Sequence, residues 1–126
     1  MKLRHLDEDN DKRRKLAAIY AEQLAGVVTL PIEPVNTRHV YHLYVIRHPG
    51  RDALMQFLRE RGIGTAIHYP VPIHLQPAYR GRLGEVGSLP ETERAAREIV
   101  SLPMYPELSA DDVRTVARAI REFAAQ

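Results

Sequence analysis

Residues 65–79, with the sequence TAIHYPVPIHLQPAY, constrain the fold most because they combine three prolines with two histidines and two tyrosines. Each proline removes a backbone N–H donor, fixes φ and drives the preceding residue toward an extended conformation. The pattern is therefore unfavourable for a helix or a central strand and predicts a stiff loop. Because residues 65–67 have the pattern of a short strand, His68 and Tyr69 lie where a strand passes into this loop. Proteins often place ligand-binding groups at such positions.

The chemistry of the two loop histidines alone does not assign them a function. A histidine beside a proline often serves only as a hydrogen-bonded loop residue, so His68 has both a structural and a ligand-binding interpretation. His74 has the apolar neighbours Ile73 and Leu75, which favours packing over function.

Length and composition predict one domain and exclude several classes of protein. The chain has 126 residues, of which 44% are apolar, enough for one core of ordinary size. Its net charge of +2 and its 6% aromatic content without tryptophan give no basis for nucleic-acid binding. The lack of cysteine excludes a disulfide framework and thiolate metal sites and is typical of a cytoplasmic protein. No apolar run approaches the roughly 18 residues of a membrane span, so we expect neither an export signal nor a membrane protein.

Hydrophobic periodicity and turn residues predict four helices and three strands. The helices are expected at residues 3–25, 52–61, 90–100 and from 110 onward, and the strands at 27–30, 40–46 and 64–67. Gly26 and Gly62 follow the first two helices as C-terminal stops, and Ser109 with Asp112 forms a capping-box pattern before the last. This order predicts an α+β fold, a small antiparallel or mixed sheet of about three strands covered by helices.

The charged opening segment, residues 7–15, has no apolar face to bury. We therefore expect its helical turns to lie in solvent or against something outside this chain. All three lysines, Lys2, Lys12 and Lys15, fall at or near this segment, so the folded middle offers no buried amine for a Schiff base.

No self-contained catalytic or metal-binding set is visible. His39 and His42 are expected on opposite sides of a strand, and prolines separate His68 from His74, so we expect no metal site. There is no Gly-x-Ser-x-Gly pattern of a serine hydrolase. The glycine-rich residues 80–87 follow no strand and lack a Lys-Ser/Thr pair, which predicts a surface loop and not a phosphate cradle.

Three segments in register, residues 40–47, 59–74 and 101–109, resemble in order and spacing the C-terminal domain of the DegT/DnrJ/StrS family of sugar aminotransferases. The likeness spans nearly the whole chain. It implies the small domain of an aspartate-aminotransferase-fold (fold type I) enzyme, with residues 1–26 as the entry helix from a large domain and residues 27–126 as the small domain.

The family transfers an amino group from glutamate or glutamine to a nucleotide-linked keto-sugar, and its members are usually homodimers. Their large domain holds pyridoxal phosphate and the lysine that binds it. The resemblance therefore implies no catalytic, cofactor-binding or metal-binding residue here and no cofactor bound to this chain alone. It makes His68 and Tyr69 substrate contacts, and both side chains can hydrogen-bond sugar hydroxyls. Tyr44 and His42 also match the family and are interpreted as packing residues.

Two functional hypotheses follow from these observations. In the first, the chain closes the substrate cleft of a nucleotide-sugar aminotransferase and is inactive alone. In the second, it is a stand-alone interaction or assembly module that reuses the fold without catalysis. A small histidine-based hydrolase or metal protein is a more distant third hypothesis.

Overall fold

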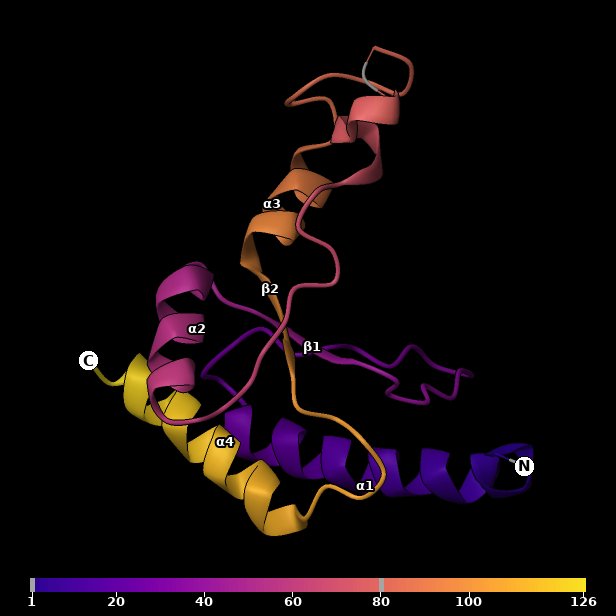
Figure 1. The fold of residues 1–126 in the computed structure, drawn as a ribbon, viewed down its shortest axis with the longest axis vertical. Helices are drawn as coiled ribbons and strands as arrows, with labels where there is room; N and C mark the ends of the chain where they lie inside the picture. Colours follow the sequence, from indigo (N-terminus) through magenta and orange to yellow (C-terminus); the bar gives the residue numbers. More distant parts are fainter. Residues whose placement is uncertain (1, 80) are drawn as a thin grey trace.

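The computed structural model describes residues 2–79 and 81–126 (Figure 1). Arg80, part of the predicted glycine-rich loop, lies outside the described residues. The helices are α1 (Leu6–Leu24), α2 (Arg51–Glu60), α3 (Pro90–Glu98) and α4 (Ala110–Ala124), and the strands are β1 (Tyr44–Arg47) and β2 (Ile99–Leu102). Short 3-10 helices occur at Lys2–His5 (η1), Ile73–Leu75 (η2) and Pro77–Tyr79 (η3). Among the described residues, no helix is long and apolar enough to cross a membrane.

The two strands form an antiparallel sheet whose register runs from Tyr44 opposite Leu102 to Arg47 opposite Ile99. Alternate residues point to opposite faces of a sheet. One face is buried in a core to which α1, α2 and α4 also contribute, and α1 packs along α4 (Figure 1). The strand residues in this core are Tyr44, Ile46, Val100 and Leu102. The α+β class and the helix-covered antiparallel sheet are confirmed.

The sheet has two strands, so the predictions at residues 27–30 and 64–67 are wrong as strands. Each segment contributes one bridge: Thr29 pairs with Arg47 on the outer edge of β1, and Ala66 pairs with Ser101 on the outer edge of β2. The first segment is cut short by Pro31, which has no N–H to donate. The second leaves the sheet as it enters the proline loop.

The remaining strand errors concern where strands begin. Residues 40–43 precede β1 because Tyr41 has a φ of 48°, in the left-handed region that an extended strand cannot contain. The sequence predicts a helix to about residue 100 and then a break over residues 101–106, but α3 ends at Glu98 and β2 follows it directly.

The predicted signals at the start of α4 and at the end of α2 are confirmed. The Ser109 hydroxyl accepts from the Asp112 N–H at 3.0 Å, and the Asp112 carboxylate accepts from the Ser109 N–H, which completes the capping box. At the end of α2, Gly62 has a φ of 74° and donates to Arg59, while Ile63 donates to Leu58. This is the hydrogen-bond pattern of a Schellman motif, and it needs a residue that tolerates positive φ.

The charged half of α1 is exposed or half-buried, as expected, and three of its residues also bind a loop of this same chain, a contact that the sequence did not predict. Arg14 donates to the Glu33 carboxylate at 2.6 Å and to the His39 carbonyl at 2.7 Å. Arg13 donates to the Val40 carbonyl at 3.1 Å. An ion pair joins Arg38 to Asp11. The charged turns therefore fix residues 31–43, the segment that leads into β1.

The segment between α2 and α3 forms an arm that projects from the helical body (Figure 1). From Ala66 the chain runs beside β2, continues through η2 and η3, and returns as α3. The arm begins where the predicted site residues lie.

Candidate functional site

The structure places His68 and Tyr69 two and three residues beyond the Ala66–Ser101 bridge, at the base of the arm. The His68 ring is half-buried, and its Nδ1 lies 2.9 Å from the Ser101 hydroxyl. The Tyr69 side chain is 75% exposed, and its ring meets the His68 ring edge to face with centroids 5.7 Å apart. The two side chains therefore form one polar pair, with one member anchored to β2 and the other open to solvent.

Ser101 is the residue of this site that the sequence did not reveal. It is 5% exposed, although it lies on the face of β2 opposite the core. The only sequence signal was its place at the start of the motif at residues 101–109, where the sequence predicts a break after a helix. Its role becomes visible only once β2 and the Ala66 bridge are known.

An apolar hollow of about 290 Å³ adjoins Tyr69, between the proline loop and α3. Its lining comes from Tyr69, Val71, Pro72, Ile73, Gln76, Thr92, Ala95, Ala96 and Ile99. Polar atoms are supplied mainly by the phenol of Tyr69, the amide of Gln76 and the hydroxyl of Thr92. The hollow can accommodate an apolar group beside a hydrogen-bonding edge.

His74 is packed, as its apolar neighbours indicated. It is 3% exposed, and its Nε2 lies 3.2 Å from Oε1 of Glu93 on α3. The same carboxylate oxygen accepts from the Gly87 N–H at 2.7 Å. The hydrogen bond from His74 is the main cause of a pKa of Glu93 below its usual range. The pair joins the two sides of the arm, which gives His74 a structural role.

The other histidines form no metal centre. Across residues 2–79 and 81–126, no group of three or more His, Asp or Glu side chains is arranged to hold a metal ion. His39 and His42 lie before β1 instead of on a strand, and His39 accepts through Nδ1 from the Tyr41 N–H at 2.9 Å.

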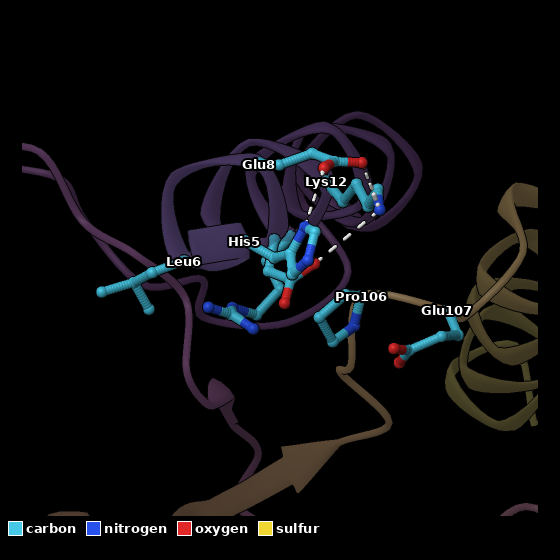
Figure 2. A pocket seen from close by; sticks show the side chains of 8 residues that line it. His5, Leu6, Glu8, Lys12, Pro106 and Glu107 are labelled. Atoms are coloured by element: carbon cyan, nitrogen blue, oxygen red, sulfur yellow. Dashed lines mark ion pairs between the residues drawn. The ribbon is translucent and has the colours of Figure 1, made fainter. Parts of the chain in front are cut away.

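A larger and highly charged cavity, about 740 Å³, lies between the start of α1 and the Pro106–Glu107 turn (Figure 2). Lys12 lines this cavity, and its ammonium group lies 2.8 Å from the Glu8 carboxylate and 3.7 Å from the Asp9 carboxylate. The hydrogen bond to Glu8 raises the pKa of Lys12, so its amine stays protonated. None of the predicted site residues lines this cavity.

The sequence profile described as the DegT/DnrJ/EryC1/StrS aminotransferase family matches residues 1–121. The chain belongs to this family. Among the curated DegT/DnrJ/EryC1/StrS relatives, the "Pleiotropic regulatory protein" of Geobacillus stearothermophilus is 44% identical over 127 residues, covering 98% of this chain and 34% of the relative. The dTDP-3-amino-3,4,6-trideoxy-alpha-D-glucose transaminase of Streptomyces venezuelae is 44% identical over 126 residues, covering 98% of this chain and 33% of the relative.

Solved structures of the same fold show the same partial coverage. The S. venezuelae protein DesV, solved in complex with a ketimine intermediate, matches with a TM-score of 0.96 and 44% identity over 99% of this chain and 34% of DesV. NtdA from Bacillus subtilis, solved with bound PMP, matches with a TM-score of 0.79 and 28% identity over 94% of this chain and 29% of NtdA. The chain thus spans about a third of the length of the DegT/DnrJ/EryC1/StrS proteins it matches.

Proposed function

We propose that this chain is the small C-terminal domain of a nucleotide-sugar aminotransferase. The proposal rests on the family match over residues 1–121, together with the coverage of about a third of a relative named as a sugar transaminase. In this proposal, residues 1–26 enter from a large cofactor-binding domain and residues 27–126 form the domain that closes the substrate cleft. The amino group passes from glutamate or glutamine to a keto-sugar carried on a nucleotide. A cytoplasmic location fits the lack of cysteine.

His68 and Tyr69 are the proposed substrate contacts. A sugar presents hydroxyl groups that both donate and accept, and an imidazole and a phenol can meet them in either role. The 75% exposure of Tyr69 leaves its hydroxyl open to such a partner. The neighbouring hollow can accommodate a less polar part of the same ligand.

Exposed apolar side chains along the arm support a domain that packs against further protein. Ile73 is 63% exposed, Val86 is 82% exposed and Leu83 is 54% exposed. Large exposed apolar patches mark protein contacts, and these three side chains all come from the arm. In the proposed enzyme, the large domain or a second subunit of a homodimer covers these side chains.

The lysines whose side chains the structure describes are poorly suited to hold pyridoxal phosphate, so the domain alone is proposed to be inactive. The cofactor needs a lysine amine that loses its proton readily. Lys12 is exposed on α1 and paired with two carboxylates, which hold its proton, and Lys15 is exposed on the same helix. Mixing the chain with pyridoxal phosphate and borohydride tests this point. No specific lysine adduct is expected, and a specific adduct with turnover would contradict the proposal.

A stand-alone interaction module remains the second candidate, because a relative 44% identical to this chain is named a pleiotropic regulatory protein. Light scattering separates the two candidates. A clean monomer at high concentration favours an independent module, whereas self-association through the apolar arm favours a domain that lacks its covering partner.

A chimera tests the proposed function directly. Residues 1–126 replace the matching third of the S. venezuelae transaminase, and amino transfer to its keto-sugar nucleotide is measured. We expect the chimera to bind pyridoxal phosphate and to retain activity. His68→Ala and Tyr69→Phe should each lower kcat/KM by about tenfold, the effect of losing one hydrogen bond to substrate.

Tyr105→Phe is the matched control, because Tyr105 is 49% exposed and lies on another surface of the domain. It should leave kcat/KM unchanged. If the chimera binds cofactor and turns over, but both site variants match the control, His68 and Tyr69 are not substrate contacts.

A further inference from the structure

We propose that Ser101 is a positioning residue that fixes the orientation and the tautomer of the His68 ring. The inference rests on the proposed function, in which His68 meets the sugar, and it adds a residue that does not itself touch the ligand. Its basis is the 2.9 Å contact between the Ser101 hydroxyl and Nδ1 of His68, made by a serine that is only 5% exposed.

The sheet holds the Ser101 backbone in place from both sides. Ser101 lies opposite Val45 of β1 on one edge. On the other edge its N–H donates to the Ala66 carbonyl at 2.8 Å, and its carbonyl accepts from the Ala66 N–H at 3.3 Å. Pairing on both edges fixes the backbone and Cβ of Ser101, and from this fixed position its hydroxyl can orient a neighbouring ring.

The same pairing explains why His68 reaches Ser101. Residues directly opposite in an antiparallel pair place their side chains on the same face, and residues two apart along a chain share a face. His68 follows Ala66 by two residues, so its ring is a diagonal neighbour of Ser101, a separation that a long side chain can bridge. The contact follows from the register and not from a chance approach of loops.

The contact decides which ring nitrogen faces the ligand. A neutral imidazole has one N–H and one bare nitrogen, and the hydrogen bond made by one nitrogen sets the state of the other. The proposal assigns the Ser101 hydroxyl as the donor to Nδ1, because among the described residues this buried hydroxyl has no other partner and would leave its own proton unpaired if it accepted. The ring proton then resides on Nε2. Within the described residues, Nε2 of His68 has no hydrogen-bond partner and Ser101 is the sole partner of Nδ1. His68 therefore presents an N–H donor, which suits a sugar hydroxyl or carbonyl oxygen.

Nuclear magnetic resonance on the 126-residue chain tests the inference without any sugar. Long-range ¹H–¹⁵N spectra report the His68 tautomer, and the nuclear Overhauser effect between His68 Hε1 and the β-protons of residue 101 reports ring orientation. We expect the wild type to show the Nε2–H tautomer and a strong Overhauser effect. Ser101→Ala should lose most of that effect and populate both tautomers, and Ser101→Thr should restore both signals because it keeps the hydroxyl.

Ser88→Ala, which removes an exposed loop hydroxyl, is the control and should match the wild type. Slow exchange of the residue 66 and residue 101 amides shows that the bridge is intact in each variant. If Ser101→Ala keeps an intact bridge, the wild-type Overhauser effect and the wild-type tautomer, packing alone holds His68 and the inference fails. An Nδ1–H tautomer in the wild type would also overturn the inference, and that result needs no variant.

The chimera then links this position to function. Ser101→Ala should lower kcat/KM by a factor similar to that of His68→Ala, about tenfold or less, and the double variant should fall no further. If His68→Ala has no effect in the chimera, the proposed sugar contact fails while the spectroscopic result on Ser101 stands separately. Additive losses would instead mean that Ser101 acts independently of His68.

Discussion

Two tyrosines stack on each other in the core, so the removal of one hydroxyl can be compared between two side chains in contact. The rings of Tyr20 and Tyr44 lie 4.8 Å apart, and their side chains are 0% and 1% exposed. The Tyr20 hydroxyl donates to the Pro103 carbonyl at 3.0 Å, whereas the Tyr44 hydroxyl has no hydrogen-bond partner among the described residues. Removing each hydroxyl therefore has a different expected effect on the free energy of unfolding.

Tyr20→Phe should lower the free energy of unfolding by about 1 kcal/mol, because it removes a hydrogen bond and leaves a partly buried carbonyl without this partner. Tyr44→Phe should be neutral or raise it by up to about 1 kcal/mol, because it removes a buried polar group that makes no hydrogen bond. The difference between the variants, about 1 to 2 kcal/mol, is several degrees in Tm for a domain of this size.

Urea unfolding followed by circular dichroism measures the two free energies, and an unchanged m value confirms that both variants unfold from comparable states. The reasoning is refuted if Tyr44→Phe loses as much stability as Tyr20→Phe. That result would mean that the Tyr44 hydroxyl makes an interaction of equal strength in solution.

Three further predictions concern pH and helix capping. Burial raises the pKa of Tyr44 to about 12 and raises that of Tyr20 further, so the folded state favours the neutral phenols. The contribution of the two phenols to stability should be complete below about pH 10, the pKa of an unfolded tyrosine, and should be lost as the pH rises toward 12. Tyr44→Phe should make this loss of stability shallower in urea titrations from pH 9 to 12. The hydrogen bond from His74 lowers the pKa of Glu93 from 4.5, so its contribution should be present above that pH and lost as the pH falls through the lower folded value. Thermal unfolding between pH 3 and 6 should therefore show a weaker acid dependence for Glu93→Gln, and an unchanged profile would exclude the pair as a source of acid sensitivity. Ser109→Ala should lower the free energy of unfolding by about 1 kcal/mol while Ser109→Asp, which keeps a capping oxygen, loses much less; equal losses would show that the side-chain cap contributes little.

The helices were predictable because their signals are local. Proline at the first turn of α3, the Ser109–Asp112 capping box and Gly62 after α2 each act within a few residues of the chain. Their effect on the backbone does not depend on distant partners, so the sequence alone located these helix ends to within about two residues.

The strands were less predictable because each is four residues long and is defined by its partner. The segment 27–30 has high β-propensity, yet only Thr29 is paired. Ile99–Leu102 is a strand because β1 and Ala66 pair with it on both sides. Propensity over so few residues is a weak signal beside tertiary pairing.

In the candidate site, too, local features were predictable and contacts between distant segments were not. The loop position of His68 and Tyr69 could be predicted from prolines and from the family resemblance. The partners of the loop histidines could not, because Ser101 lies 33 residues from His68 and Glu93 lies 19 residues from His74. Residues that meet only through the sheet register or across the arm leave no periodic signal along the chain.

The pairing of the first long helix with the last has a consequence for how the polypeptide matures on the ribosome. α1 packs against α4, and Tyr44 of β1 pairs with Leu102 of β2. Both the helix packing and the sheet are therefore completed by segments that are translated after α1 and β1. Contacts between such distant segments form slowly because a long loop must be closed first. Until most of α4 has emerged, the face of α1 that packs against α4 lacks this cover and is open to chaperones.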